Sequence, residues 1–155
     1  SKTQQGGDYM TRISNKQILS CIEEVKQGNT PLGLKLLKST EGTPYHPKAK
    51  AWYGYCLARE KDKFSIGINL CNEALKIDPQ EPEIYLALGR IFLILNRREK
   101  AIRTLQQGVK MHRSQDIERL LKALGVRKQP IFPFLKRRNY LNVTSGRLFS
   151  KIGLR

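Results

Sequence analysis

A pattern of two helical stretches recurs about every 34 residues between residue 14 and residue 115. The clearest copy opens with Ala51-Trp52-Tyr53-Gly54-Tyr55-Cys56-Leu57-Ala58 and closes with Ala74 and Asp78-Pro79. A second copy follows, in which we align Tyr85 with Trp52. A single helix pair of this length cannot bury its apolar face alone, so the copies must stack on one another.

This pattern resembles the tetratricopeptide repeat (TPR) family. The resemblance depends on an aromatic residue in the first helix, a small residue four positions later, and an Ala and a Pro that close the second helix; these are Trp52, Cys56, Ala74 and Pro79. It implies an all-α fold, a right-handed α-solenoid of about three helix hairpins plus a capping helix and an extended C-terminal tail. The predicted hairpins span 14–47, 48–81 and 82–115, and the first is degenerate because Gln17 replaces the aromatic.

Residues 114–125 are predicted to form the capping helix. Ser114 is a suitable N-cap, Asp116 and Glu118 suit the first turn, and Gly125 can end the helix. Ahead of the repeats, residues 1–13 contain Gly6-Gly7 and few apolar residues, which predicts a flexible lead. Together with the tail at 126–155, this gives a 14–125 helical domain between two extensions.

The tail is strongly basic. The chain has a net charge of +16, and eight basic residues with no acidic residue lie between Arg127 and Arg155. Such a segment attracts phosphates, anionic lipids or acidic protein surfaces. It also contains aromatic residues, so it either packs on its own domain or docks on another protein. Its candidate docking or anion-binding residues are Phe132, Phe134, Lys136, Arg137, Arg138, Tyr140 and Arg147. The run from Pro133 to Asn142 is similar to a C-terminal signature of some bacterial TPR proteins.

The TPR resemblance also implies a concave groove lined by the first helix of each pair. The groove residues transferred to this sequence are Ile18, Ile22, Lys50, Tyr53, Leu57, Leu86, Arg90 and Ile94. The family's carboxylate clamp is not reproduced, since Ile18, Ile22 and Gly54 stand where polar residues are needed. A helix or an extended peptide with apolar anchors and some acidic character is the expected ligand. The alternative is that the tail or a second copy of the chain, in a homodimer, covers this face.

Catalytic signals are weak. His46 and His112 show no ligand spacing, and the three cysteines contain no Cys-x-x-Cys pair. No glycine-rich phosphate loop is present. Carboxylates such as Glu81 and Glu83 are assigned to caps or solvated helix faces. The sequence therefore predicts no enzyme, no cofactor and no metal.

The predicted function is a scaffold or adaptor that binds a protein partner, with the tail as a second docking element. Nucleic-acid or anionic-surface binding through the tail is the alternative. An odd number of cysteines favours a reducing compartment, and no apolar run is long enough to span a bilayer. We therefore expect a cytoplasmic protein, with peripheral association with a membrane as the alternative.

Overall fold

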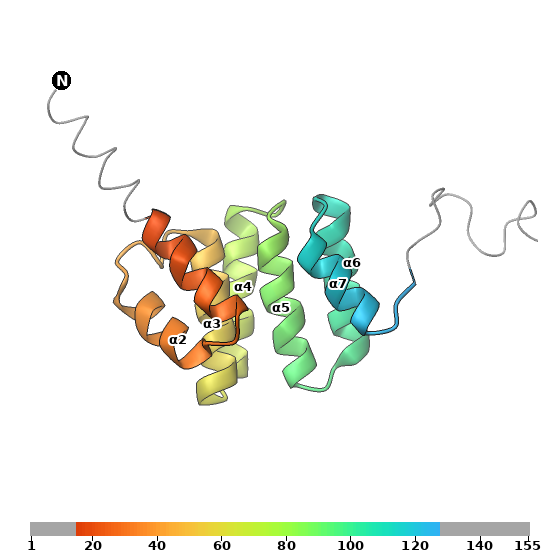
Figure 1. Cartoon of the computed structure of the whole chain (residues 1–155), viewed down its shortest axis with the longest axis horizontal. Coiled ribbons are helices and arrows are strands. Elements are labelled where there is room, and N and C mark those ends of the chain that lie inside the picture. The colour runs from red at the N-terminus through yellow and green to blue at the C-terminus, as the bar shows by residue number, and fades with distance from the viewer. Residues whose placement is uncertain (1–14, 128–155) are drawn as a thin grey trace, which may run out of the picture. The chain divides into compact units, whose positions relative to one another are not determined.

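The computed structural model describes residues 15–127, and within them it contains seven helices and no strand (Figure 1). The helices are the first helix (15–26), α2 (Thr30–Ser39), α3 (Pro47–Lys61), α4 (Phe64–Ile77), α5 (Pro82–Ile94), α6 (Arg98–Met111) and α7 (Gln115–Ala123). They follow one another in chain order, with the first helix and α2 at one end and α6 and α7 at the other. The predicted all-α solenoid is confirmed.

In the second and third pairs, the first helix, which we call the inner helix, begins at a proline that follows a capping side chain. Pro47 and Pro82 open α3 and α5, where the N–H that proline lacks would have no partner in the helix. The Glu81 side chain accepts a hydrogen bond from the backbone N–H of Glu83, and Ser114 does the same for Ile117 at the start of α7.

Three residues with left-handed backbone fix the repeat length. Gly28, Asp62 and Asn96 have φ values of 102°, 53° and 57°, and each follows the one before it by 34 residues. Each lies between the two helices of a pair. The outer helices α4 and α6 obey the same spacing, since they start at Phe64 and Arg98. The period is therefore 34 residues through all three pairs.

This period corrects the alignment of the middle copy by one residue. Tyr85 corresponds to Ala51, not to Trp52, which instead corresponds to Leu86. Tyr85 packs on α6, where a Cβ added at Gly108 would lie 2.7 Å from the Tyr85 Cβ. Ala51 lies against α4, the equivalent of α6 in the preceding pair, and its carbonyl oxygen accepts a hydrogen bond from the Cys71 thiol at 3.6 Å. The alignment was wrong because the middle copy carries its large aromatic one position later.

The core runs continuously through the stacked pairs. Fully buried side chains come from successive helices, including Trp52, Ile84, Ile91, Leu105 and Ile117. The last of these belongs to α7, so the capping helix covers the end of the third pair. The helices α3 and α4 approach most closely at Gly54 and Gly67, where a Cβ on Gly67 would lie only 2.5 Å from the Gly54 carbonyl oxygen.

We expect Gly67→Ala to destabilise the fold by about 2 kcal/mol or more, because the new methyl meets backbone that cannot move away. The matched change Gly89→Ala meets no backbone, only the Leu105 side chain, with Cδ2 at 2.7 Å and Cγ at 2.8 Å, and alanine favours a helix by about 1 kcal/mol. Its cost should be smaller than that of Gly67→Ala, because a side chain can shift where backbone cannot. Urea unfolding of both variants measures the difference, and equal costs would contradict this account of the α3–α4 contact.

Candidate functional site

The 34-residue period sorts the inner helices into rows of equivalent positions that face the concave side. One row is Ile18, Trp52 and Leu86, the next is Ile22, Cys56 and Arg90, and the third is Lys26, Glu60 and Ile94. The first row is completely buried, and so are Ile22 and Cys56. The prediction that Ile18, Ile22 and Leu86 line an open groove is therefore corrected: they are core residues that hold the inner helices together.

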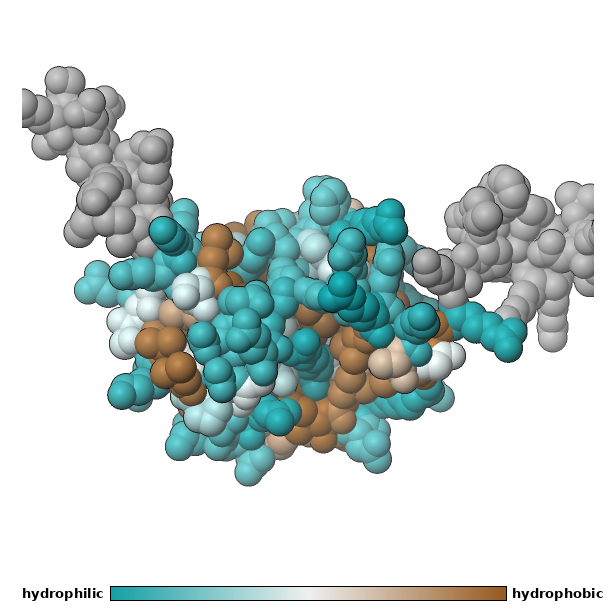
Figure 2. Space-filling model, in the orientation of Figure 1, coloured by the Kyte–Doolittle hydropathy of each residue, from teal (hydrophilic) through white to brown (hydrophobic). Residues whose placement is uncertain are grey.

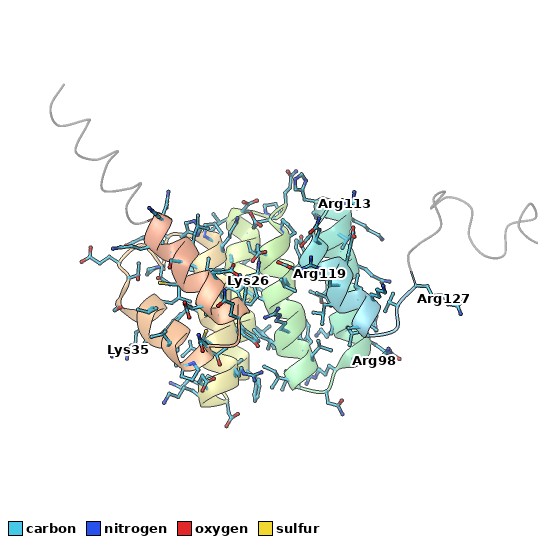
Figure 3. All side chains as sticks on the ribbon, viewed as in Figure 1. Lys26, Lys35, Arg98, Arg113, Arg119 and Arg127 are labelled. Atoms are coloured by element: carbon cyan, nitrogen blue, oxygen red, sulfur yellow. The ribbon has the colours of Figure 1, made fainter. Side chains whose placement is uncertain are left out.

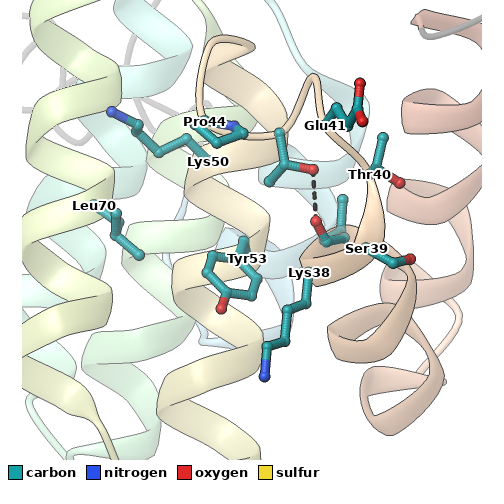
Figure 4. Close-up of a pocket in the computed structure, with 10 residues that line it drawn as sticks. Lys38, Ser39, Thr40, Glu41, Pro44, Lys50, Tyr53 and Leu70 are labelled. Carbon is teal, nitrogen blue, oxygen red and sulfur yellow. Dashed lines mark hydrogen bonds between the residues drawn. The ribbon is translucent and has the colours of Figure 1, made fainter.

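The groove residues predicted for α3 lie on a different side of the helix. Lys50, Tyr53 and Leu57 share one helix face because of their spacing, and they are one residue out of step with the concave rows. Lys50 and Tyr53 line a separate cavity of about 450 Å³ beside the α2–α3 connection and Leu70 of α4 (Figure 4). The Lys50 ammonium is 2.9 Å from a Glu73 carboxylate oxygen. The structure therefore separates these residues from Arg90 and Ile94.

Arg90 is half-buried and Ile94 is exposed, so both remain candidates for the predicted groove. The Arg90 guanidinium lies 5.2 Å from the centre of the Trp52 ring and 5.9 Å from that of Tyr55, so two aromatic faces position it. Ile94 is 38% exposed, and Leu93 beside it is half-buried. Hydrophobic side chains gather over α5 and α7 in this view (Figure 2). This region combines an apolar surface with a fixed cation.

Lys26 makes the most extensive polar contacts on this face. Its Nζ lies 2.6 Å from Asp116 Oδ2 in α7 and 3.1 Å from Glu83 Oε1 in α5 (Figure 3). Glu83 also accepts a hydrogen bond from the Trp52 indole at 3.1 Å through its other oxygen. We call the contacts of Lys26 with Glu83 and Asp116 the Lys26 bridge. It connects the first helix to the capping helix.

The assignment of Glu83 to a cap or solvated face is corrected by these contacts. Its side chain is only 18% exposed, and both of its oxygens have partners. One signal for a role of Glu83 was present in the sequence, namely its position in the first turn of α5. Its partners Lys26 and Trp52 are distant in sequence, so no local pattern could identify them.

The pKa shifts of Lys26 and Asp116 show that each group stabilises the charge of the other. Burial alone would lower the pKa of Lys26, but its contacts with Asp116 and Glu83 outweigh burial and raise that pKa. The pKa of Asp116 is lowered, first by the hydrogen bond from Lys26 and then by the charges of Lys26, Arg119 and Arg90, which together exceed the opposing effect of burial. Lys26 and Asp116 are thus held in their charged forms near neutral pH.

The described residues offer little for catalysis. Within 15–127, no three His, Cys, Asp or Glu side chains are grouped so that they could hold a metal ion. Cys21, Cys56 and Cys71 are buried free thiols. Burial raises the pKa of Cys56 and of Cys71 to about 12, which keeps both in the unreactive thiol form. None of the helices in this part of the chain is long and apolar enough to cross a membrane.

The predicted tail residues Phe132, Phe134, Lys136, Arg137, Arg138, Tyr140 and Arg147 lie outside the residues that the structure describes. Their proposed docking role therefore stays a prediction. The residues that the structure adds to the predicted site are Glu83 and Asp116, through the Lys26 bridge.

The fold defines the class of protein first: an α-solenoid of stacked helix hairpins whose inner helices present a concave face. The family model for the tetratricopeptide repeat matches residues 67–124, so this part of the chain is similar to that family.

Two known proteins are similar to the chain. A putative pentatricopeptide repeat-containing protein of Arabidopsis thaliana is 29% identical over 114 residues, a match that covers 68% of this chain and 25% of that protein. The chain thus spans about a quarter of that relative's length. The solved structure of the first TPR domain of Spaghetti (RPAP3), bound to the HSP90 peptide SRMEEVD, has a TM-score of 0.54 at 17% identity. That similarity covers 72% of this chain and 92% of that one, and it shows the fold.

The cysteines give a direct chemical prediction. We expect Cys56 and Cys71 to resist a thiol-specific disulfide reagent at about pH 8, because their raised pKa and burial leave almost no accessible thiolate. Cys21 should react slowly for the same reason, since burial raises its pKa as well. All three should react at once in denaturant. Rapid modification of Cys56 or Cys71 in the folded chain would contradict the structure at that position.

The lowered pKa of Asp116 predicts an acid-dependent stability. A carboxylate with a lowered folded pKa stabilises the fold above its ordinary value of 3.8, and this contribution is lost as the pH falls through the folded pKa. Asp116→Asn should therefore lose less stability than the unchanged chain between about pH 5 and about pH 2. Asp62→Asn is the control, because Asp62 is exposed and forms no ion pair within the described range. If Asp116→Asn keeps the full acid dependence, Asp116 does not contribute as described.

Proposed function

We propose that the chain is a non-catalytic adaptor that binds a segment of a partner protein on the open part of its concave face. The observation that carries the proposal is the surface of α5, where half-buried Leu93 and exposed Ile94 stand beside the Arg90 guanidinium. A similar solenoid, that of Spaghetti (RPAP3), holds a peptide of HSP90. Helix-in-groove recognition uses this combination of apolar anchors with a few fixed polar groups.

The charges on this surface favour a partner segment with some acidic character. Arg90 forms no ion pair within the described residues, and its two aromatic neighbours keep it in place. Arg59 is exposed, and it occupies in α3 the position that Leu93 occupies in α5. A carboxylate near these two guanidinium groups would form charge-assisted hydrogen bonds, while apolar side chains would cover Leu93 and Ile94.

The acidic C-terminal tail of a chaperone is not the ligand that we propose. Ile18 and Ile22 are buried and apolar, so they cannot supply the polar contacts that a terminal carboxylate needs. Among the similar structures, binding of the HSP90 peptide belongs to Spaghetti (RPAP3). For this chain, an internal helix or extended segment with apolar anchors fits the exposed surface better.

Positive charge supports the proposal in a second way. Of the 29 Lys and Arg residues, 20 lie within residues 15–127, together with 12 of the 13 acidic residues. The helical domain is therefore basic on its own, and the tail adds to it as a proposed second docking element. Such a charge raises the rate at which acidic partners associate, but it does not select among them. Selection would come from the apolar contacts at Leu93 and Ile94.

Ile94→Asp tests the adaptor function, because it places a charge on the proposed apolar anchor site without entering the core. We expect Ile94→Asp to capture at least about tenfold less of its specific partner proteins from nuclease-treated cell extract than the unchanged chain does. Ile66→Asp is the matched control, since Ile66 on α4 is 48% exposed and lies outside the concave rows. It should capture partners as the unchanged chain does.

Two results would count against the adaptor function. Equal capture by both variants would place the partner elsewhere on the molecule. Capture that disappears with nuclease in the unchanged chain would instead favour binding to nucleic acid through basic residues.

A further inference from the structure

The Lys26 bridge joins the two ends of the helical domain across the concave face. Lys26 stands in the last turn of the first helix, and Asp116 stands in the first turn of the capping helix. The side chains of Lys26, Glu83 and Asp116 are 20%, 18% and 35% exposed. Ion pairs with this degree of burial are screened less by salt than pairs on an open surface. The bridge is thus a defined contact between elements that the repeat pattern alone does not bring together.

The bridge also occupies a position that a partner segment would need. Lys26 is equivalent to Ile94 in the third pair, and Ile94 is the exposed anchor residue of the proposed binding surface. The remaining member of the row, Glu60, accepts a hydrogen bond from Thr30. Lys26 contacts Glu83 in the first turn of α5, whereas Ile94 is the last residue of that helix. A segment that runs along α5 from Ile94 to its first turn therefore meets a lysine whose carboxylate partners are already in place.

The two carboxylates differ in how easily they could be exchanged. Glu83 is the less exposed of the two, and it is bound to both Lys26 and the Trp52 indole. Asp116 is more exposed, and apart from Lys26 it has only Arg119, at 3.8 Å, as an ion-pair partner within the described residues. Its helix α7 is also short, at 9 residues. Asp116 is therefore the carboxylate that an incoming acidic group would replace.

We propose that Asp116 is an intramolecular competitor for Lys26, which an acidic residue of the partner segment replaces when the segment binds. This inference rests on the proposed adaptor function and adds the chemistry of its ligand: a carboxylate about three helical turns along α5 from the apolar anchor that contacts Ile94. Exchanging one carboxylate for another keeps the Lys26 charge paired throughout. A partner with a neutral residue at that point gains nothing from Lys26, so the bridge sets specificity as well as affinity.

The decisive variant is Asp116→Asn, which keeps the size of the side chain and removes its charge. The control is Glu118→Gln in the same turn of α7, because Glu118 pairs with the exposed Arg113 and not with Lys26. The probe is a short synthetic peptide with Leu at i, i+3, i+4 and i+7 and Glu at the other positions. A second peptide has Gln in place of every Glu. Affinities are measured by titration calorimetry, after thermal melting has shown that each variant is folded.

We expect Asp116→Asn to bind the Glu peptide roughly three- to tenfold more tightly than the unchanged chain does, because the competitor is gone. Glu118→Gln should match the unchanged chain. The Gln peptide should bind the unchanged chain and Asp116→Asn equally well. Lys26→Met should clearly reduce the preference for the Glu peptide over the Gln peptide, since the group that receives the carboxylate is removed and only Arg59, Arg90 and the net charge still attract the peptide.

Equal affinity of the Glu peptide for the unchanged chain and Asp116→Asn would overturn the proposal. So would a Glu preference in Lys26→Met that equals the preference of the unchanged chain, or a failure of every form to bind the Glu peptide. These failures are distinct from failure of the adaptor function, which is decided by partner capture with Ile94→Asp and does not use the peptide.

Discussion

Close approach between the two helices of a pair is the constraint on which the rest of the structure depends. Gly54 and Gly67 leave so little space between α3 and α4 that a single methyl would meet backbone. This contact fixes the geometry of the α3–α4 pair, and the stacked pairs bury residues such as Trp52 and Leu105 completely. The concave face follows from that stacking, because the inner helices can be aligned only when their outer partners are held close.

The sequence predicted the fold well because its signals are local. Proline at the start of α3 and α5, and Gly28 between the first helix and α2, mark helix boundaries by what their backbone can and cannot do. The alignment of the middle copy with the next copy was predicted less well, by one residue. Trp52 was the most conspicuous residue, yet it fixed the alignment less reliably than the left-handed residues Asp62 and Asn96, which stand at equivalent points of the backbone.

The candidate site was harder to predict because it depends on how the solenoid curves. Arg90 and Ile94 were identified from the repeat pattern, and both are accessible on α5. Ile18 was assigned to the same surface, but stacking buries it. The pairing of Lys26 with Asp116 could not be inferred at all, since it joins the first helix to the capping helix and no pattern within one repeat specifies that distance.

On the proposed adaptor function, these contacts would let a strongly basic chain recognise its partner selectively. The net charge of +16 attracts any acidic surface, and salt weakens that attraction. At the centre of the concave face, however, the charge of Lys26 is neutralised by Glu83 and Asp116. Long-range attraction and local recognition are thus separated. An acidic protein would be drawn to the domain by its overall charge, but it would stay bound only if apolar side chains cover Ile94 and one carboxylate takes the place of Asp116.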